Sequence, residues 1–251
     1  MNVGLIIVVA AVVAIFVICA LFSIKTIGPT EVGLVTKRFG LGKLGEDNPI
    51  AFRGEAGYQG KLLMPGLRFK LWPIFGVKKF PWVQVPAGEI GVVIAQVGAQ
   101  LPIGAKSGVY KPEFGNFSHL EGFIAGGGQK GVQRLVLPPG TLLPMHPVAF
   151  MVITSRKVYG LSVSPDLVER VRGSGGAMRP ETFGLTPEQL QVVVIAPVGP
   201  NDVVGIVTAL EGEPLPLGDI ASRLGGYDDI AAMELAEGTV DSQIIEVLLG
   251  S

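Results

Sequence analysis

The side chains best suited to catalysis are few in this chain and lie far apart in the sequence. There are two histidines, His119 and His146, and one cysteine, Cys19. Either histidine could serve as a general base, but no serine or cysteine nucleophile occupies an elbow motif such as Gly-x-Ser-x-Gly. A zinc site would need carboxylates beside them, and a disulfide within the chain is impossible. We therefore expect two loop histidines that are solvated or hydrogen-bonded, and no metal site.

Two glycine-rich segments resemble phosphate-binding loops in composition only. Residues 126–131, Gly-Gly-Gly-Gln-Lys-Gly, lack the Lys-Ser/Thr pair, and residues 104–107, Gly-Ala-Lys-Ser, have alanine where the glycine before the lysine is needed. Asp228 and Asp229 are adjacent and point in different directions on a helix or a strand, which favours capping a helix over paired acid–base catalysis. The sequence thus predicts no catalytic residue and no cofactor, in a protein that is not an enzyme.

The most apolar segment of the chain lies at its start. Residues 3–22 carry no charge, and as a helix these twenty residues are about 30 Å long, which is the thickness of a bilayer core. The run is too long, and its start lacks the basic side chain, for a cleaved signal peptide. We therefore predict a transmembrane anchor over residues 1–25. The residues expected to span the membrane are Val3, Leu5, Ile6, Ile7, Val8, Val9, Val12, Val13, Ile15, Phe16, Val17, Ile18, Leu21 and Phe22.

Basic residues predict the orientation of this anchor. Lys25, Lys37, Arg38 and Lys43 follow it, whereas only the terminal amine precedes it. The positive-inside rule then places the C-terminal part in the cytoplasm, so we expect a single-pass protein of the inner (plasma) membrane.

Charge changes sign along the rest of the chain. Residues 25–90 hold ten basic and five acidic side chains, and residues 200–251 hold one and ten. Basic and aromatic side chains alternate near the anchor, which makes this stretch a candidate for contact with the membrane surface through Lys70, Trp72, Phe75, Lys78, Lys79 and Trp82. The favoured alternative is a set of strands with an aromatic core face and a solvated basic face. One such stretch in a chain of net charge −1 does not predict binding to nucleic acid.

An internal repeat indicates the architecture. Residues 86–104 and 200–218 align without gaps with eight identities in nineteen positions, and residues 29–35, Pro-Thr-Glu-Val-Gly-Leu-Val, give a third start of the same kind. The 36 glycines and 19 prolines disfavour long helices. We predict an α+β, mainly β fold in which the transmembrane helix is followed by small half-barrel or open-barrel modules with short helices.

The predicted boundaries follow from this repeat. They are a membrane-proximal β segment at 26–85, a first β module at 86–160, a loop and connecting segment at 161–199, and a second, incomplete β module with short helices at 200–251.

Two motifs resemble a known family. Residues 29–40, Pro-Thr-Glu-Val-Gly-Leu-Val-Thr-Lys-Arg-Phe-Gly, and residues 64–73, Met-Pro-Gly-Leu-Arg-Phe-Lys-Leu-Trp-Pro, follow the apolar segment. This order is similar to the opening of SPFH proteins, the superfamily of stomatin, prohibitin and flotillin. The segments 126–131 and 137–141 resemble large flotillin-like bacterial membrane proteins in particular. The resemblance implies scaffolds that assemble through a long coiled coil, but no heptad pattern occurs in these 251 residues.

The hypothesis drawn from these observations is a non-enzymatic membrane scaffold or organiser of the SPFH, flotillin-like type. Its expected partners are the lipid bilayer, further copies of itself in the membrane and other membrane proteins. The alternative is an accessory or adaptor subunit of a membrane-bound protease or of a transport complex.

Overall fold

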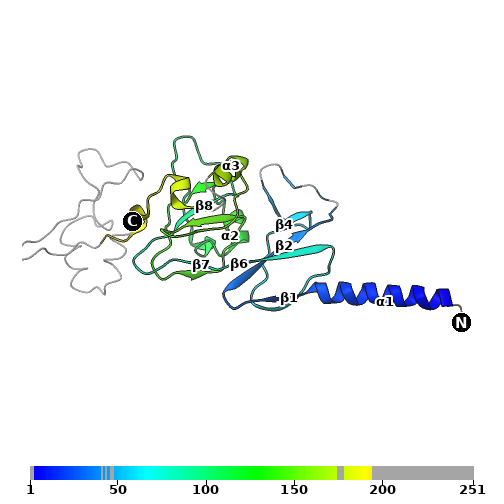
Figure 1. Ribbon diagram of the computed structural model, residues 1–251. Helices are drawn as coiled ribbons and strands as arrows, with labels where there is room; N and C mark the ends of the chain where they lie inside the picture. Colours follow the sequence, from blue (N-terminus) through cyan, green and yellow to red (C-terminus); the bar gives the residue numbers. More distant parts are fainter. Residues whose placement is uncertain (1–2, 41, 43, 46–47, 174–177, 194–251) are drawn as a thin grey trace, which may run out of the picture. The chain divides into compact units, whose positions relative to one another are not determined.

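The computed structural model describes residues 3–40, 42, 44–45, 48–173 and 178–193 (Figure 1). The chain divides into two units, residues 1–196 and 197–251. The predictions made for residues 200–251, including the second repeat copy, lie outside the described residues.

The apolar segment forms the helix α1 (Val3–Ser23). Its described Leu, Ile, Val and Phe side chains are exposed, from 48% at Ile18 to 74% at Phe16. The helix has no acidic residue in its first turn and no basic residue in its last. The helix forms readily because Leu, Ile, Val, Phe and Ala side chains have no polar group that could compete for the backbone hydrogen bonds.

The prediction that this helix spans the membrane is wrong for the part of the chain that the structure describes. Within that part, no helix is both long enough and apolar enough to cross a bilayer.

The first group of strands follows α1 directly. Strand β1 (Ile24–Ile27) pairs with β5 (Gly66–Phe69) in an antiparallel ribbon. A four-stranded sheet has the order β3-β4-β2-β6, formed by β3 (Ile50–Ala51), β4 (Gly57–Gln59), β2 (Glu31–Lys37) and β6 (Phe75–Pro81). All seven residues of β2 pair with β6, which makes this pair the centre of the strands at residues 24–81. From here on we call residues 24–81 the first module and residues 83–159 the second module; they overlap the predicted membrane-proximal segment at 26–85 and the predicted first β module at 86–160.

The second group of strands has the same plan. Strand β7 (Val83–Gln84) pairs with β10 (Leu142–Leu143) in a ribbon. The sheet has the order β12-β11-β8-β9, from β12 (Val158–Tyr159), β11 (Phe150–Ile153), β8 (Val92–Ala95) and β9 (Gly131–Val132). Helices η1 (Pro112–Phe114) and α2 (Leu120–Ala125) lie between β8 and β9 in sequence. Helices α3 (Pro165–Gly173), η2 (Pro180–Phe183) and η3 (Pro187–Leu190) follow β12.

The protein is therefore α+β with mainly strands and few helices, but the expected half-barrel and open-barrel modules are wrong. The described strands form open sheets whose outer strands, such as β9 and β12, have only one partner each. The reason is strand length, because strands of two residues offer too few hydrogen bonds to extend the sheet towards closure.

The two modules share a buried glycine in the same setting. Gly33 exchanges two backbone hydrogen bonds with Leu63, at 2.8 and 2.9 Å, and Gly91 exchanges two with Leu137 at 2.9 and 2.8 Å. Both leucines precede a turn that ends in Pro-Gly. A Cβ on Gly33 would lie 2.9 Å from Ile27, and a Cβ on Gly91 would lie 2.9 Å from Val85. The short similarity at residues 29–35 thus reflects a structural repeat.

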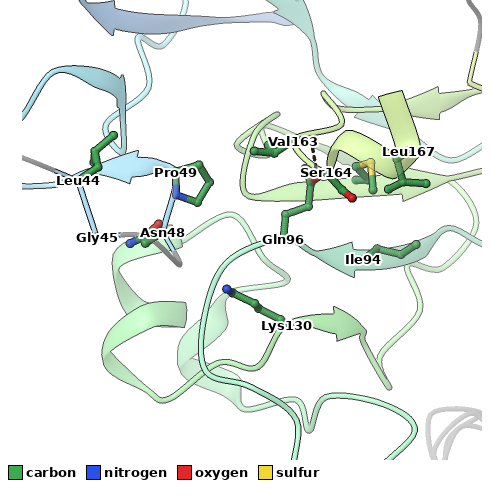
Figure 2. A pocket seen from close by; sticks show the side chains of 11 residues that line it. Leu44, Gly45, Asn48, Pro49, Ile94, Gln96, Lys130, Val163, Ser164 and Leu167 are labelled. Carbon is green, nitrogen blue, oxygen red and sulfur yellow. Dashed lines mark hydrogen bonds between the residues drawn. The ribbon is translucent and has the colours of Figure 1, made fainter. Parts of the chain in front are cut away.

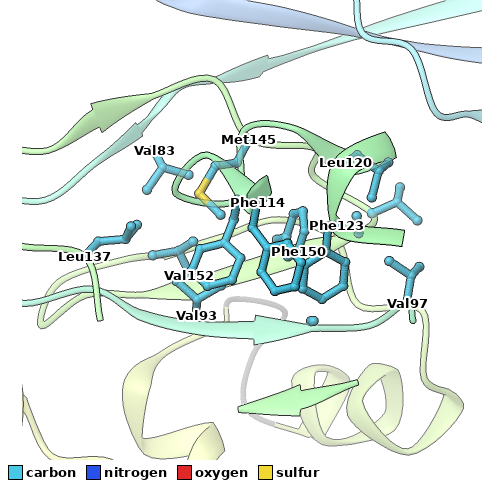
Figure 3. Packing of buried hydrophobic residues seen from close by; sticks show 14 of the residues in the cluster. Val83, Val93, Val97, Phe114, Leu120, Phe123, Leu137, Met145, Phe150 and Val152 are labelled. Carbon is cyan, nitrogen blue, oxygen red and sulfur yellow. The ribbon is translucent and has the colours of Figure 1, made fainter. Parts of the chain in front are cut away.

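The main core lies in the second module and combines aliphatic side chains with four phenylalanines (Figure 3). Phe114, Phe117, Phe123 and Phe150 are at most 1% exposed, and their ring centroids are 4.8–6.2 Å apart. Leu34 and Ile50 of the first module belong to the same cluster. Shared core residues therefore hold the two modules together.

The close packing around Gly91 predicts that Gly91→Ala destabilises the protein. The added methyl group would overlap Val85 and lie 3.2 Å from Val152 and 3.3 Å from Leu137, so we expect a loss of about 1–3 kcal/mol in the free energy of unfolding. Chemical denaturation monitored by circular dichroism measures this. Gly76→Ala is the matched control, since its Cβ would have only the Thr36 carbonyl oxygen within 4 Å. Equal losses in the two variants would contradict the packing argument.

Candidate membrane-facing surface

The junction between α1 and β1 contains no loop, because Ser23 ends the helix and Ile24 begins the strand. Ser23 is fully buried. Its hydroxyl donates to the Cys19 carbonyl oxygen at 2.5 Å and accepts from the Trp72 N–H at 2.9 Å. Its carbonyl oxygen accepts from the Lys70 N–H at 2.9 Å. These bonds fix the end of the helix to the chain that follows β5.

One face of the ribbon β1–β5 is apolar and exposed. Ile24 pairs with Phe69 and Thr26 pairs with Leu67, so these four side chains share a face. Leu67 is 70% exposed, Phe69 64% and Ile24 48%. This face begins at the last turn of α1, where Phe22 is 55% exposed. We call α1 together with Ile24, Leu67 and Phe69 the apolar surface.

The second module provides an internal comparison. In its ribbon, Val83 is 4% exposed and belongs to the core, and Leu143 packs against the same core. In the first ribbon, Ile24 and Phe69 are paired across the two strands, and both are exposed. One face of the second ribbon, formed by Val83 and Leu143, is therefore covered by the core, whereas the face of the first ribbon that carries Ile24, Leu67 and Phe69 is uncovered.

Aromatic and basic side chains surround the end of α1. The Trp72 ring lies 5.6 Å from the Phe22 ring, and the Lys70 ammonium lies 5.2 Å from the centroid of Phe75. Tryptophan and lysine are typical of the region where a membrane meets water. Three of the six predicted surface-contact residues, Lys70, Trp72 and Phe75, are thus brought together here.

The other three predicted contacts lie along β6 and just after it. Lys79 pairs with Glu31 at 3.7 Å, and the Trp82 indole N–H donates to the Glu31 carbonyl oxygen at 3.0 Å. Lys78 is exposed and adjacent to Lys79 on the strand, so the two side chains point to opposite faces. Trp82 and Lys79 therefore support the first sheet.

The membrane-contact residues predicted from the sequence do not include the exposed residues of the ribbon. Leu67, Phe69 and Leu71 alternate with Arg68 and Lys70, which is the period of a strand with one apolar face. That signal identifies an amphipathic strand, but it does not reveal that the apolar face lacks a cover. Only the pairing with β1 and the fractional exposure show this.

The two histidines have different environments. His119 is exposed and precedes α2. His146 is 2% exposed, its Nδ1 accepts from the N–H groups of Val148 and Ala149 at 3.3 and 3.1 Å, and its Nε2 donates to the Gln59 carbonyl oxygen at 3.1 Å. Burial lowers the pKa of His146 from 6.5 to about 4. A neutral His146 therefore joins the second module to β4 of the first and has a structural role.

A cavity of about 510 Å³ offers no catalytic set (Figure 2). The described residues around it include Ile94, Met151, Val163 and Leu167, with Gln96 as a central polar group. The Gln96 side-chain amide donates to the carbonyl oxygens of residues 148 and 161, at 2.9 and 2.7 Å, and accepts from the N–H of residue 163 at 3.0 Å. No carboxylate, imidazole or thiol is among the described lining residues, and no group of three metal-binding side chains occurs in the described part.

Known proteins give no further guide to this surface. Comparison with protein-family models, with curated proteins and with solved structures finds no match to the chain.

The environment of His146 predicts a stability that depends on pH. Since the folded protein holds this imidazole neutral down to about pH 4, the unfolded chain binds more protons between pH 6.5 and 4. The free energy of unfolding should fall by about 3 kcal/mol as pH drops through that window, with no further loss from this residue below it.

Denaturation midpoints across that pH range test the prediction. His146→Gln removes the titrating group and keeps a donor for the Gln59 carbonyl oxygen, so it should lower stability at pH 7 and flatten the pH dependence. His119→Gln, at an exposed position, should behave as the unaltered chain does. If the stability of the His146→Gln variant still fell between pH 6.5 and 4 as that of the unaltered chain does, the pH dependence could not be assigned to His146.

Proposed function

We propose that the protein is a non-enzymatic membrane scaffold of the SPFH, flotillin-like type, attached through the apolar surface. The observation that carries the proposal is the continuous exposure of apolar side chains from α1 onto the ribbon β1–β5. The motifs at residues 29–40 and 64–73 support the same class of protein.

The energetic argument concerns α1 first. Each large apolar side chain removed from water contributes about 1.5–3 kcal/mol when fully buried, and twelve such side chains of α1 are 48–74% exposed. Transfer of this helix from water to an apolar phase is therefore favourable by on the order of 10 kcal/mol or more. The acyl chains of a membrane leaflet supply such a phase for the exposed side chains of α1.

The ribbon extends this attachment beyond the helix. Because Ser23 joins α1 to the ribbon through buried hydrogen bonds, a membrane that receives the end of α1 also meets Ile24 and Phe69. Lys70 and Trp72 at the same junction fit the polar headgroup region. The scaffold would thus hold its first module against the membrane.

Membrane extraction of the full chain tests this attachment. Val9→Asp with Val13→Asp places charges on exposed positions of α1 and should move most of the protein to the soluble fraction. Leu67→Gln with Phe69→Gln should leave the protein bound but increase its release by high pH or urea. Val132→Gln with Leu142→Gln is the matched control, since both valine and leucine are exposed in the second module, at 43% and 45%. Undiminished binding of the α1 variant would refute the attachment.

Lateral assembly is the second part of the proposal. Strand β6 is seven residues long and has one described partner, β2, so its other edge is available for pairing between copies. Membrane attachment raises the local concentration of such edges, which favours contacts that are weak in solution.

Cross-linking of the full chain in native membranes measures this assembly. We expect species larger than one chain in membranes, and their loss when Val77→Pro removes a backbone N–H and distorts β6. Val132→Pro on the short strand β9 is the control for general loss of β structure. A purely monomeric protein in membranes would contradict the scaffold proposal, whatever the outcome for membrane attachment.

A further inference from the structure

A second surface near the end of α1 is cationic. An open hollow of about 750 Å³ is lined by the end of β2 and by the segment between β3 and β4. Lys37, Arg38 and Arg53 line it, together with a single described carboxylate, Glu55. The described residues that line the hollow therefore carry a net charge of +2.

The carboxylate of Glu55 is engaged locally. Its Oε2 accepts from the Arg53 N–H at 2.8 Å, and hydrogen bonds from the backbone at Glu55 and Arg53 hold the pKa of this carboxyl below its usual range. Glu55 thus shapes the turn by binding main-chain N–H groups. The guanidinium groups of Arg38 and Arg53 lie on exposed residues of the hollow.

The shape of the hollow depends on close backbone approach and on Lys37. A Cβ on Gly40 would lie 2.5 Å from the Ala56 nitrogen, so the two sides of the hollow meet at a position that only glycine fits. Across the hollow, the Lys37 ammonium donates to the Gly54 carbonyl oxygen and so ties β2 to the turn that holds Arg53. The cations are therefore gathered by the fold around one space.

The hollow is linked to the end of α1 by a short path. The Arg38 N–H donates to the Ile74 carbonyl oxygen at 2.9 Å, and the Trp72 N–H donates to the Ser23 hydroxyl at 2.9 Å. Residues 72 and 74 are two peptide units apart, at most about 7 Å. The Arg38 nitrogen therefore lies within roughly 17 Å of the Ser23 hydroxyl oxygen. The hollow is thus close to the end of α1, where a membrane that holds α1 would have its headgroups.

We propose that this hollow binds the phosphate group of an anionic phospholipid. Guanidinium groups bind phosphate oxygens through paired N–H donors, and two of them converge here beside an ammonium group. The choice of a lipid phosphate rests on the proposed membrane attachment, because the path through Ile74 and Trp72 places the hollow beside the apolar surface. The site would select membranes rich in anionic lipid.

Titration of the full chain in uncharged detergent micelles with phosphatidylglycerol or phosphatidylcholine tests the site. Phosphatidylglycerol should bind more tightly than phosphatidylcholine by on the order of 10- to 30-fold at low salt. Arg38→Gln with Arg53→Gln should abolish this preference, and Lys61→Gln with Arg172→Gln, which removes the same charge at other exposed positions, should retain it. Equal preference in the Arg38/Arg53 variant and the unaltered chain would overturn the proposal.

Two further arms separate the possible failures. Millimolar inorganic phosphate should change the affinity for phosphatidylglycerol by less than about twofold. If phosphate instead displaced the lipid completely, the site would bind free phosphate, and the choice of a lipid ligand would be overturned. Membrane extraction of the Arg38/Arg53 variant should match that of the unaltered chain. If that variant is extracted normally but still prefers anionic lipid, the headgroup site fails while the attachment through α1 stands.

Discussion

The hydrogen bonds of Ser23 determine how the apolar helix relates to the rest of the protein. A buried hydroxyl that accepts from the Trp72 N–H, and a carbonyl oxygen that accepts from the Lys70 N–H, leave no flexible linker between α1 and the first module. An unpaired buried group at this point would cost about 1–3 kcal/mol, so the junction is strongly favoured. The exposed ribbon and the cationic hollow consequently have defined positions relative to the end of α1.

The repeated module explains how the same strands serve two purposes. Gly33 and Gly91 occupy equivalent close contacts with Leu63 and Leu137, and each module joins a ribbon to a sheet. In the second module the ribbon contributes Val83 to a core built on four phenylalanines. In the first module the ribbon carries Leu67 and Phe69 to the surface. A duplicated unit thus provides a stable core in one copy and an exposed apolar face in the other.

Local sequence signals predicted some of this structure. The uncharged run 3–22 predicted a helix, and the structure has the helix α1 there. The membrane crossing and the half-barrels were wrong, because no helix among the described residues is long and apolar enough to cross a bilayer and the described strands form open sheets. The apolar ribbon could not be predicted, since it arises from pairing between residues 24 and 69, which are far apart in sequence. The cationic hollow likewise needs the approach of Gly40 to Ala56.

If the apolar surface meets lipid as proposed, Trp72 lies at the level of the headgroups. Quenching of Trp72 fluorescence by bromine placed at different depths of the acyl chains measures this directly in the full chain, with Trp82→Phe removing the only other tryptophan. We expect strong quenching by bromine near the headgroup and weaker quenching by bromine at the bilayer centre. Trp72 fluorescence that is insensitive to brominated lipid at every depth, in a protein shown to be folded, would contradict it.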